Sequence, residues 1–138
     1  MNGDLSDSYT SAISRCSWVK LYYGIVSKII RENNLKIGVE VGIGYGCHAK
    51  EILDNTDIEH LYLVDPLIPY KNDAFPNDVN KIGGFEILLE NINKLLYTHK
   101  HRYTHFRQPS LSITNDDIDD TSIDVVFLDG DHSYESVK

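Results

Sequence analysis

Cysteines, basic residues and long apolar runs are all scarce in this sequence. Its two cysteines, Cys16 and Cys47, are too few for a disulfide framework, so we expect two free thiols that are buried or half-buried. Thirteen Lys and Arg residues against 21 Asp and Glu residues give a net charge of −8. This charge argues against a nucleic-acid partner, because phosphate binding needs a basic surface. No apolar run reaches the roughly 18 residues that a membrane helix needs, so we expect no membrane span.

The composition is otherwise that of an ordinary globular protein. Hydrophobic residues make up 41% and charged residues 25% of the 138 residues, which suits one domain with a real core. Residues 1–17 show no apolar periodicity and are expected to form a polar arm, with 18–138 as the folded domain. The polar start lacks the basic and apolar regions of a signal peptide, so the sequence predicts a cytoplasmic protein.

Short β-branched segments alternate with amphipathic stretches along the rest of the chain. Apolar spacing predicts helices at 18–30, 49–53 and 82–96, and strands are predicted at 36–41, 60–64, 103–106 and 122–128. Such alternation predicts an α/β fold, a Rossmann-like parallel sheet with helices on both faces. The fourth strand is a continuous apolar run, which is typical of a strand covered on both faces.

The sharpest motif is a glycine-rich turn between the first strand and the next helix. Residues 40–46 read E-V-G-I-G-Y-G, and glycines at alternate positions let the backbone turn tightly and approach a ligand closely. A nicotinamide-binding loop would read G-x-G-x-x-G, whereas the third glycine here comes one residue early. With an acidic residue two positions before its first glycine, the turn resembles motif I of the class I S-adenosylmethionine-dependent methyltransferases.

An acidic residue ends the second predicted strand. Asp65 follows the strand sequence HLYLV, and a carboxylate at this point can accept hydrogen bonds from both ribose hydroxyls of a bound nucleoside. Pro66 comes next, so a turn-capping role for Asp65 is the alternative. With the glycine turn nearby we favour the ribose role, and we expect Leu67 to pack against the adenine.

The end of the fourth strand carries a second motif. The strand delivers Asp129 to its carboxyl end, where ligands bind in open α/β sheets, and a carboxylate that ends an apolar strand needs a partner. Residues 128–135 read L-D-G-D-H-S-Y-E and closely resemble a segment of a methyltransferase family related in fold to catechol and macrocin O-methyltransferases. In those relatives the matching aspartate helps to bind Mg²⁺, and residues near the histidine contact the cofactor or act as a base.

The resemblance implies a function for each motif. It implies O-methylation of a small-molecule hydroxyl with S-adenosylmethionine as cofactor, Asp129 as a ligand of Mg²⁺ and His132 as the general base. The adenine would be contacted by Gln108 or Ser110, because the segment after the third strand has no acidic residue of the kind usual in the family. The expected contacts to the rest of the cofactor are Glu40, Gly42, Gly44, Tyr45 and Gly46.

The resemblance covers residues 39–138 and also implies the strand order 3-2-1-4, with the fold stopping after the fourth strand. The remaining metal ligands of those enzymes come from later in the fold, so an incomplete metal site is predicted. The fourth strand is interior in that fold. We therefore expect its open edge either to support a homo-oligomer or to be covered within a longer protein.

Other functions stay open beside this one. One alternative is a half-fold that binds the cofactor or a partner without chemistry, which the early stop favours. A nicotinamide-dependent oxidoreductase is disfavoured by the glycine spacing. A zinc site at His99, His101 and His105 is also disfavoured, because their spacing matches no common ligand pattern. The locally basic stretch 100–107 is expected to be a solvated edge.

Overall fold

Four parallel strands form the centre of the fold. In the computed structural model, which describes residues 16, 20–69, 75–119 and 121–129, they are β1 (Ile37–Val41), β2 (His60–Val64), β3 (Tyr103–Phe106) and β4 (Val125–Leu128). The order across the sheet is β3-β2-β1-β4, and every pairing is parallel. This confirms the predicted α/β class, with a Rossmann-like sheet and the order 3-2-1-4.

Alternation along the strands gives the sheet two apolar faces. Leu61 and Leu63 belong to one face and are 2% and 0% exposed, whereas Val39 and Val64 belong to the other face and are 8% and 2% exposed. Successive side chains of a strand leave the sheet on opposite sides. Glu40, next to Val39, therefore points to the face of Leu63.

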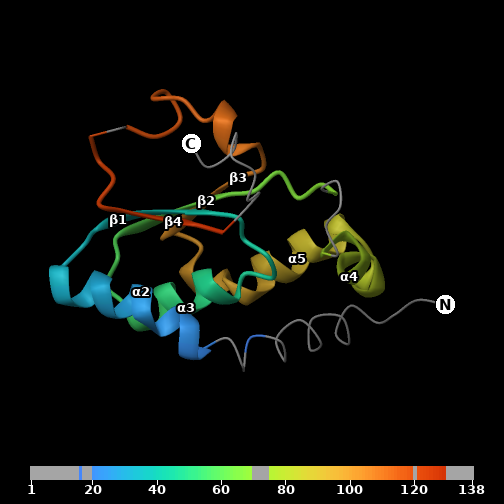
Figure 1. Cartoon of the computed structure of the whole chain (residues 1–138), viewed down its shortest axis with the longest axis horizontal. Helices are drawn as coiled ribbons and strands as arrows, with labels where there is room; N and C mark the ends of the chain where they lie inside the picture. Colours follow the sequence, from blue (N-terminus) through green and yellow to red (C-terminus); the bar gives the residue numbers. More distant parts are fainter. Residues whose placement is uncertain (1–15, 17–19, 70–74, 120, 130–138) are drawn as a thin grey trace.

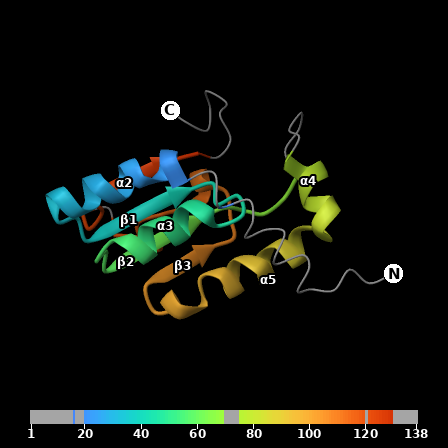
Figure 2. The same cartoon turned by 90° about the horizontal axis from the view of Figure 1, so that it is seen from below.

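Three α-helices cover the face of Leu63. The helices α2 (Lys20–Asn33), α3 (Cys47–Asn55) and α5 (Phe85–Leu95) lie side by side along this face (Figures 1 and 2). Each presents apolar residues at helical spacing, such as Ile52 on α3 and Ile92 on α5, and these form the main core with the leucines of β2. None of the helices in the described part of the chain is long and apolar enough to cross a membrane.

The helix predicted over 82–96 is interrupted near its start. A separate helix, α4 (Phe75–Ile82), ends before Gly83, and α5 begins at Phe85. Gly83 and Gly84 have φ values of 113° and 98°, which favour glycine and end a helix. The apolar spacing continues across this break, so the spacing alone could not reveal it.

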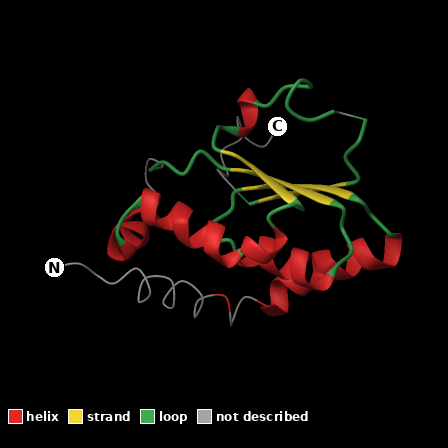
Figure 3. Ribbon diagram, turned by 180° about the vertical axis from the view of Figure 1, so that it is seen from behind, coloured by secondary structure: helices red, strands yellow, loops and turns green. Residues whose placement is uncertain are grey.

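The second face of the sheet carries no α-helix among the described residues, so the prediction of helices on both faces holds for one face only. The connection from β3 to β4 crosses this face with a 3-10 turn, η2 (Ser110–Ser112), and places Ile118 in a small cluster with Val39 (Figure 3). Its many Asp, Ser and Thr residues favour turns over helices. Val126 and Leu128 are consequently 51% and 53% exposed, so the prediction that β4 is covered on both faces is wrong for the described residues.

β4 also forms one edge of the sheet. Among the described residues it pairs with β1 alone, in a register that joins Val39 to Val126. An edge of this kind presents backbone groups that another strand can pair with. The homo-oligomer expected through this edge stays a prediction.

Cys16 and Cys47 form a disulfide, so the prediction of two free thiols is wrong. Their Cα atoms lie 5.0 Å apart although 31 positions separate them in the sequence. Cys16 also packs against the main core, while the other residues of the predicted arm lie outside the described part of the chain. Two cysteines without a motif spacing do not reveal such a pair, because the pairing depends on tertiary structure. Disulfides are typical of oxidising compartments, and the cytoplasmic location stays a prediction.

Candidate functional site

The carboxyl ends of β1 and β4 lie where the strand order reverses. Along the chain β2 is added on one side of β1, and β4 later takes the position on the other side. In open α/β sheets, ligands bind in the crevice at such a switch point. Two predicted motifs meet here, because the glycine loop (residues 42–46) follows β1 and the Asp129 N–H donates a 2.8 Å hydrogen bond to the Val41 carbonyl oxygen.

The glycines of the glycine loop have different structural roles. Gly42, Gly44 and Gly46 have φ values of 87°, 58° and 88°, which glycine adopts at little cost. A Cβ on Gly46 would lie 3.3 Å from Leu95 Cδ2, whereas a Cβ on Gly44 would meet nothing within 4 Å. Gly46 therefore permits close packing on α5, and Gly44 is where the backbone borders open space. Tyr45, between them, packs against the main core.

Asp65 anchors the glycine loop from the neighbouring strand. Its carboxylate accepts hydrogen bonds from the Ile43 N–H at 2.9 Å and the Leu67 N–H at 2.8 Å, and the residue is 4% exposed. Both carboxylate oxygens are thus engaged with backbone amides, as the turn-capping alternative expects. The ribose contact stays a prediction, and it would have to use the lone pairs that these two amides leave.

The structure does not support Leu67 as an adenine contact. Its side chain is 1% exposed and belongs to the main core. Leu67 has a φ of 52°, and the next side chain, Ile68, is 51% exposed. Among the described residues of this loop, Ile68 is the exposed large apolar side chain. The sequence could not show this, because a positive φ is rare for leucine.

Glu40 lies buried beneath the glycine loop. Glu40 and His48, a residue of the first turn of α3, are 1% and 2% exposed, and Glu40 Oε1 lies 3.5 Å from His48 Nδ1. The His48 ring packs against Phe127 of β4 with centroids 4.2 Å apart. Among the described residues Glu40 Oε2 has no hydrogen-bond partner. The pair links β1, α3 and β4 at the switch point, and the role of His48 was not predicted.

Burial raises the pKa of the Glu40 carboxyl group above its ordinary value of 4.5. The nearby His48 opposes this rise, and the negative charges of Asp129 and Asp65 add to it. The charges at the ends of β2 and β4 thus act on the Glu40 carboxyl group near the end of β1. A raised pKa means that folding favours the protonated form of Glu40.

Replacing Glu40 by glutamine is expected to flatten the dependence of stability on pH. The folded protein keeps the Glu40 proton at pH values where the unfolded chain has lost it. The contribution of Glu40 to wild-type stability should therefore fall as the pH rises above about 4.5, until the raised pKa of the folded state is passed. Urea unfolding between about pH 4 and pH 8 measures this slope.

The matched control is Glu59→Gln, which makes the same change at an exposed position. This control should keep the wild-type slope, whereas Glu40→Gln should lose the part that Glu40 contributes. Parallel pH profiles for Glu40→Gln and the wild type would contradict the role given to burial of Glu40.

Gln108 and Ser110 lie where the chain passes from β3 onto the second face. Gln108 Nε2 donates hydrogen bonds to the Ser112 carbonyl oxygen at 3.3 Å and to the Ser112 hydroxyl at 3.1 Å. Ser110 borders a cavity of about 210 Å³ that Val41 and Val64 also line. Adenine contacts by either residue stay predictions, and Ser110 is the one that faces a cavity beside the strand ends.

The described residues contain no group of three or more His, Cys, Asp and Glu side chains that could hold a metal ion. Mg²⁺ usually keeps several water ligands and takes one or two carboxylates from the protein, and Asp129 is the carboxylate expected here. The Mg²⁺ site at Asp129 stays a prediction. His132, the expected base, lies outside the described residues.

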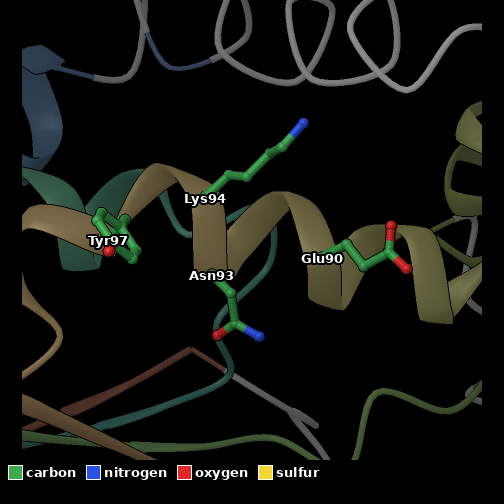
Figure 4. Close-up of a pocket in the computed structure, with 4 residues that line it drawn as sticks. All are labelled: Glu90, Asn93, Lys94 and Tyr97. Carbon is green, nitrogen blue, oxygen red and sulfur yellow. The ribbon is translucent and has the colours of Figure 1, made fainter.

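A larger cavity lies along the exposed side of α5. Glu90, Asn93, Lys94 and Tyr97 line this cavity of about 610 Å³ (Figure 4). Lys94 and Asn93 point to opposite sides (Figure 4), and Asn93 Oδ1 accepts a 3.2 Å hydrogen bond from the Tyr103 hydroxyl. Because these side chains do not converge on one point, we assign no site to this cavity.

The histidines considered for zinc have other partners or are exposed. His99 Nε2 lies 2.7 Å from an Asp54 carboxylate oxygen, and His105 Nε2 lies 2.9 Å from the Asp65 carbonyl oxygen. His101 is exposed. The same basic stretch was expected to be solvated, yet the half-buried guanidinium of Arg102 donates to backbone carbonyl oxygens at the end of α3 and beyond it.

No model of a known protein family matches the chain, and no curated protein matches it at a significant level.

Proposed function

We propose that this chain binds S-adenosylmethionine at the glycine loop and is the cofactor-binding part of a class I methyltransferase. The observation that carries the proposal is Gly44, which has a positive φ and borders open space at the point where the strand order reverses. Such a loop lets a ligand approach the backbone without a side chain in between. The acidic residue before the loop and the early third glycine favour S-adenosylmethionine over a nicotinamide dinucleotide.

The surroundings of the loop suit the chemical parts of this cofactor. The amino end of α3 directly follows the loop, and among the described residues no side chain caps it. Its N–H groups favour an anionic group such as the methionine carboxylate. Ile68 would offer exposed apolar surface to the adenine, and Ser110 would offer a hydroxyl from the cavity that Val41 and Val64 also line. Asp65 keeps the loop in shape through Ile43.

S-adenosylmethionine supplies an activated methyl group on a sulfonium sulfur when it is bound. The contribution of this chain is to hold an acceptor hydroxyl in line with that group, which is largely a matter of positioning. Asp129 lies beside the end of β1, where its carboxylate can accept the hydrogen bond of an acceptor hydroxyl. His132 remains the proposed base. Mg²⁺ at Asp129 stays a prediction, and no step here is routed through it.

Gly44→Ala is expected to weaken binding of S-adenosylhomocysteine at least about tenfold, which corresponds to about 1.4 kcal/mol. The added methyl group would occupy the open space that the cofactor needs. Calorimetric titration of the wild type and the variant measures this difference. Gly84→Ala is the matched control, because Gly84 also has a positive φ and open space at its Cβ position, but lies at the start of α5.

Equal affinity of Gly44→Ala and the wild type would remove the loop from the binding site. Tighter binding of NAD than of S-adenosylhomocysteine would favour an oxidoreductase instead. Asp65→Ala is a poorer test of a cofactor contact, because it also releases the Ile43 N–H that holds the loop. Transfer of a labelled methyl group to hydroxylated small molecules then separates an enzyme from a cofactor-binding module without chemistry.

A further inference from the structure

We propose that the Cys16–Cys47 disulfide is a site of reversible thiol–disulfide exchange, and that its redox state controls the glycine loop. The part of this inference that concerns cofactor affinity rests on the proposed function. Both cysteines of the chain are in this bond. Cys47 is the first residue of α3, immediately after the loop residue Gly46. The covalent link is therefore attached where the proposed cofactor site ends.

The glycine loop depends on restraints at both of its ends. At the sheet, the Ile43 N–H donates to Asp65 at 2.9 Å. At the helix, the Gly46 N–H donates to the Ile43 carbonyl oxygen at 3.0 Å, and the Gly46 carbonyl oxygen accepts the Lys50 N–H of α3 at 2.9 Å. The helix end of the loop thus depends on the position of the first turn of α3. The disulfide at Cys47 is the covalent restraint on that turn.

The chemistry of exchange favours Cys47 as the leaving group. A thiolate in the first turn of a helix is stabilised by the helix dipole, and among the described residues no side chain caps α3. Both cysteines are half-buried and so partly accessible. One thiolate of a dithiol reductant attacks Cys16 Sγ and forms a new S–S bond, while the old bond breaks with its electron pair on Cys47 Sγ.

A second attack completes the reduction. The other thiolate of the reductant attacks the reductant's own sulfur in the mixed disulfide, closes a cyclic disulfide and releases Cys16 as a thiolate. The reductant is oxidised by two electrons and the protein disulfide is reduced by two. The two protons that the dithiol gave up end on the two cysteine thiols.

Reduction is expected to loosen the loop and weaken cofactor binding. Once the bond is broken, noncovalent packing of Cys16 against the main core remains, and the first turn of α3 has lost its covalent restraint. If the fraction of molecules with an ordered loop falls from nearly all to about one in ten, the apparent Kd rises about tenfold.

Hydrogen exchange and calorimetry on the full chain test this, with dithiothreitol as the dithiol. Amides of residues 42–48 are expected to exchange at least about tenfold faster in the reduced protein and to exchange faster there than amides of β2, whose rates rise only as far as the lower free energy of global unfolding allows. The Kd of S-adenosylhomocysteine should rise in parallel. The double variant Cys16→Ser/Cys47→Ser is the control, because it should resemble the reduced wild type and should not respond to the dithiol.

Equal exchange of residues 42–48 in the oxidised and reduced proteins would overturn the inference. Equal exchange rates for residues 42–48 and for β2 in the reduced protein would also overturn it, because reduction would then act on the whole domain rather than on the loop. Faster loop exchange with an unchanged Kd would overturn the claim that the redox state of the disulfide changes cofactor affinity. Faster loop exchange with no binding in either state would support the redox control of the loop and contradict the proposed function.

Discussion

Replacing Arg102 by methionine is expected to lower the free energy of unfolding by about 3–4 kcal/mol, a sum of lost charged hydrogen bonds that is reduced by partial exposure. Nη1 donates to the Leu53 carbonyl oxygen at 2.9 Å, and Nη2 donates to those of Thr56 and Ile58, each at 2.9 Å. These carbonyls belong to the last turn of α3 and the segment before β2, where no further helical turn can supply donors. The Arg102 guanidinium therefore caps the carboxyl end of α3.

Methionine keeps the apolar part of the side chain, so the drop in the free energy of unfolding measures the loss of the guanidinium N–H donors. The free energy of unfolding of Arg102→Lys should lie between those of the wild type and Arg102→Met, because one ammonium group cannot reproduce the planar fork of donors. Arg31→Met is the matched control. Arg31 Nη1 donates one exposed 3.0 Å hydrogen bond to the Asn55 carbonyl oxygen at the same helix end, so its loss should stay below about 1 kcal/mol. Urea unfolding measures all three, and equal losses for the two methionine variants would contradict the assignment.

The strands could be predicted from the sequence because their signals are local. β2 and β3 have the predicted bounds, and β1 differs by one residue. The fourth strand begins at Val125 rather than at 122. Before it, the Asp124 carboxylate accepts hydrogen bonds from the N–H groups of Lys36 and Ile37 at 2.8 and 3.0 Å. That contact joins segments far apart in the sequence, so no local pattern could reveal it.

The position of the candidate site could be predicted, but the directions of its side chains could not. The glycine spacing and the strand ends place the glycine loop, Asp65 and Asp129 at one edge of the sheet, as the structure has them. The inward turn of the Asp65 carboxylate depends on an amide 22 positions away. Arg102 is a similar case, because its basic neighbours suggest a solvated side chain, whereas the carbonyl oxygens that accept its hydrogen bonds lie 44 to 49 positions away.

Breaking the Cys16–Cys47 bond is expected to lower the free energy of unfolding by about 3–4 kcal/mol in the chain-entropy account of disulfides. The bond joins residues 31 positions apart, and closing a loop of that length removes many conformations from the unfolded chain. Most of the effect therefore acts on the unfolded state. It is distinct from the proposed local effect on the glycine loop, which acts within the folded state.

Urea unfolding of the oxidised and the reduced wild type measures this difference. The slope of stability against urea should be smaller for the oxidised protein, because a cross-linked unfolded chain exposes less surface. Cys16→Ser/Cys47→Ser should match the reduced wild type in midpoint and slope, which separates the lost cross-link from the presence of thiols. A change of about 3–4 kcal/mol is a large share of the stability of an ordinary domain. An equal midpoint before and after reduction, or two free thiols in the folded unreduced protein, would contradict the bond.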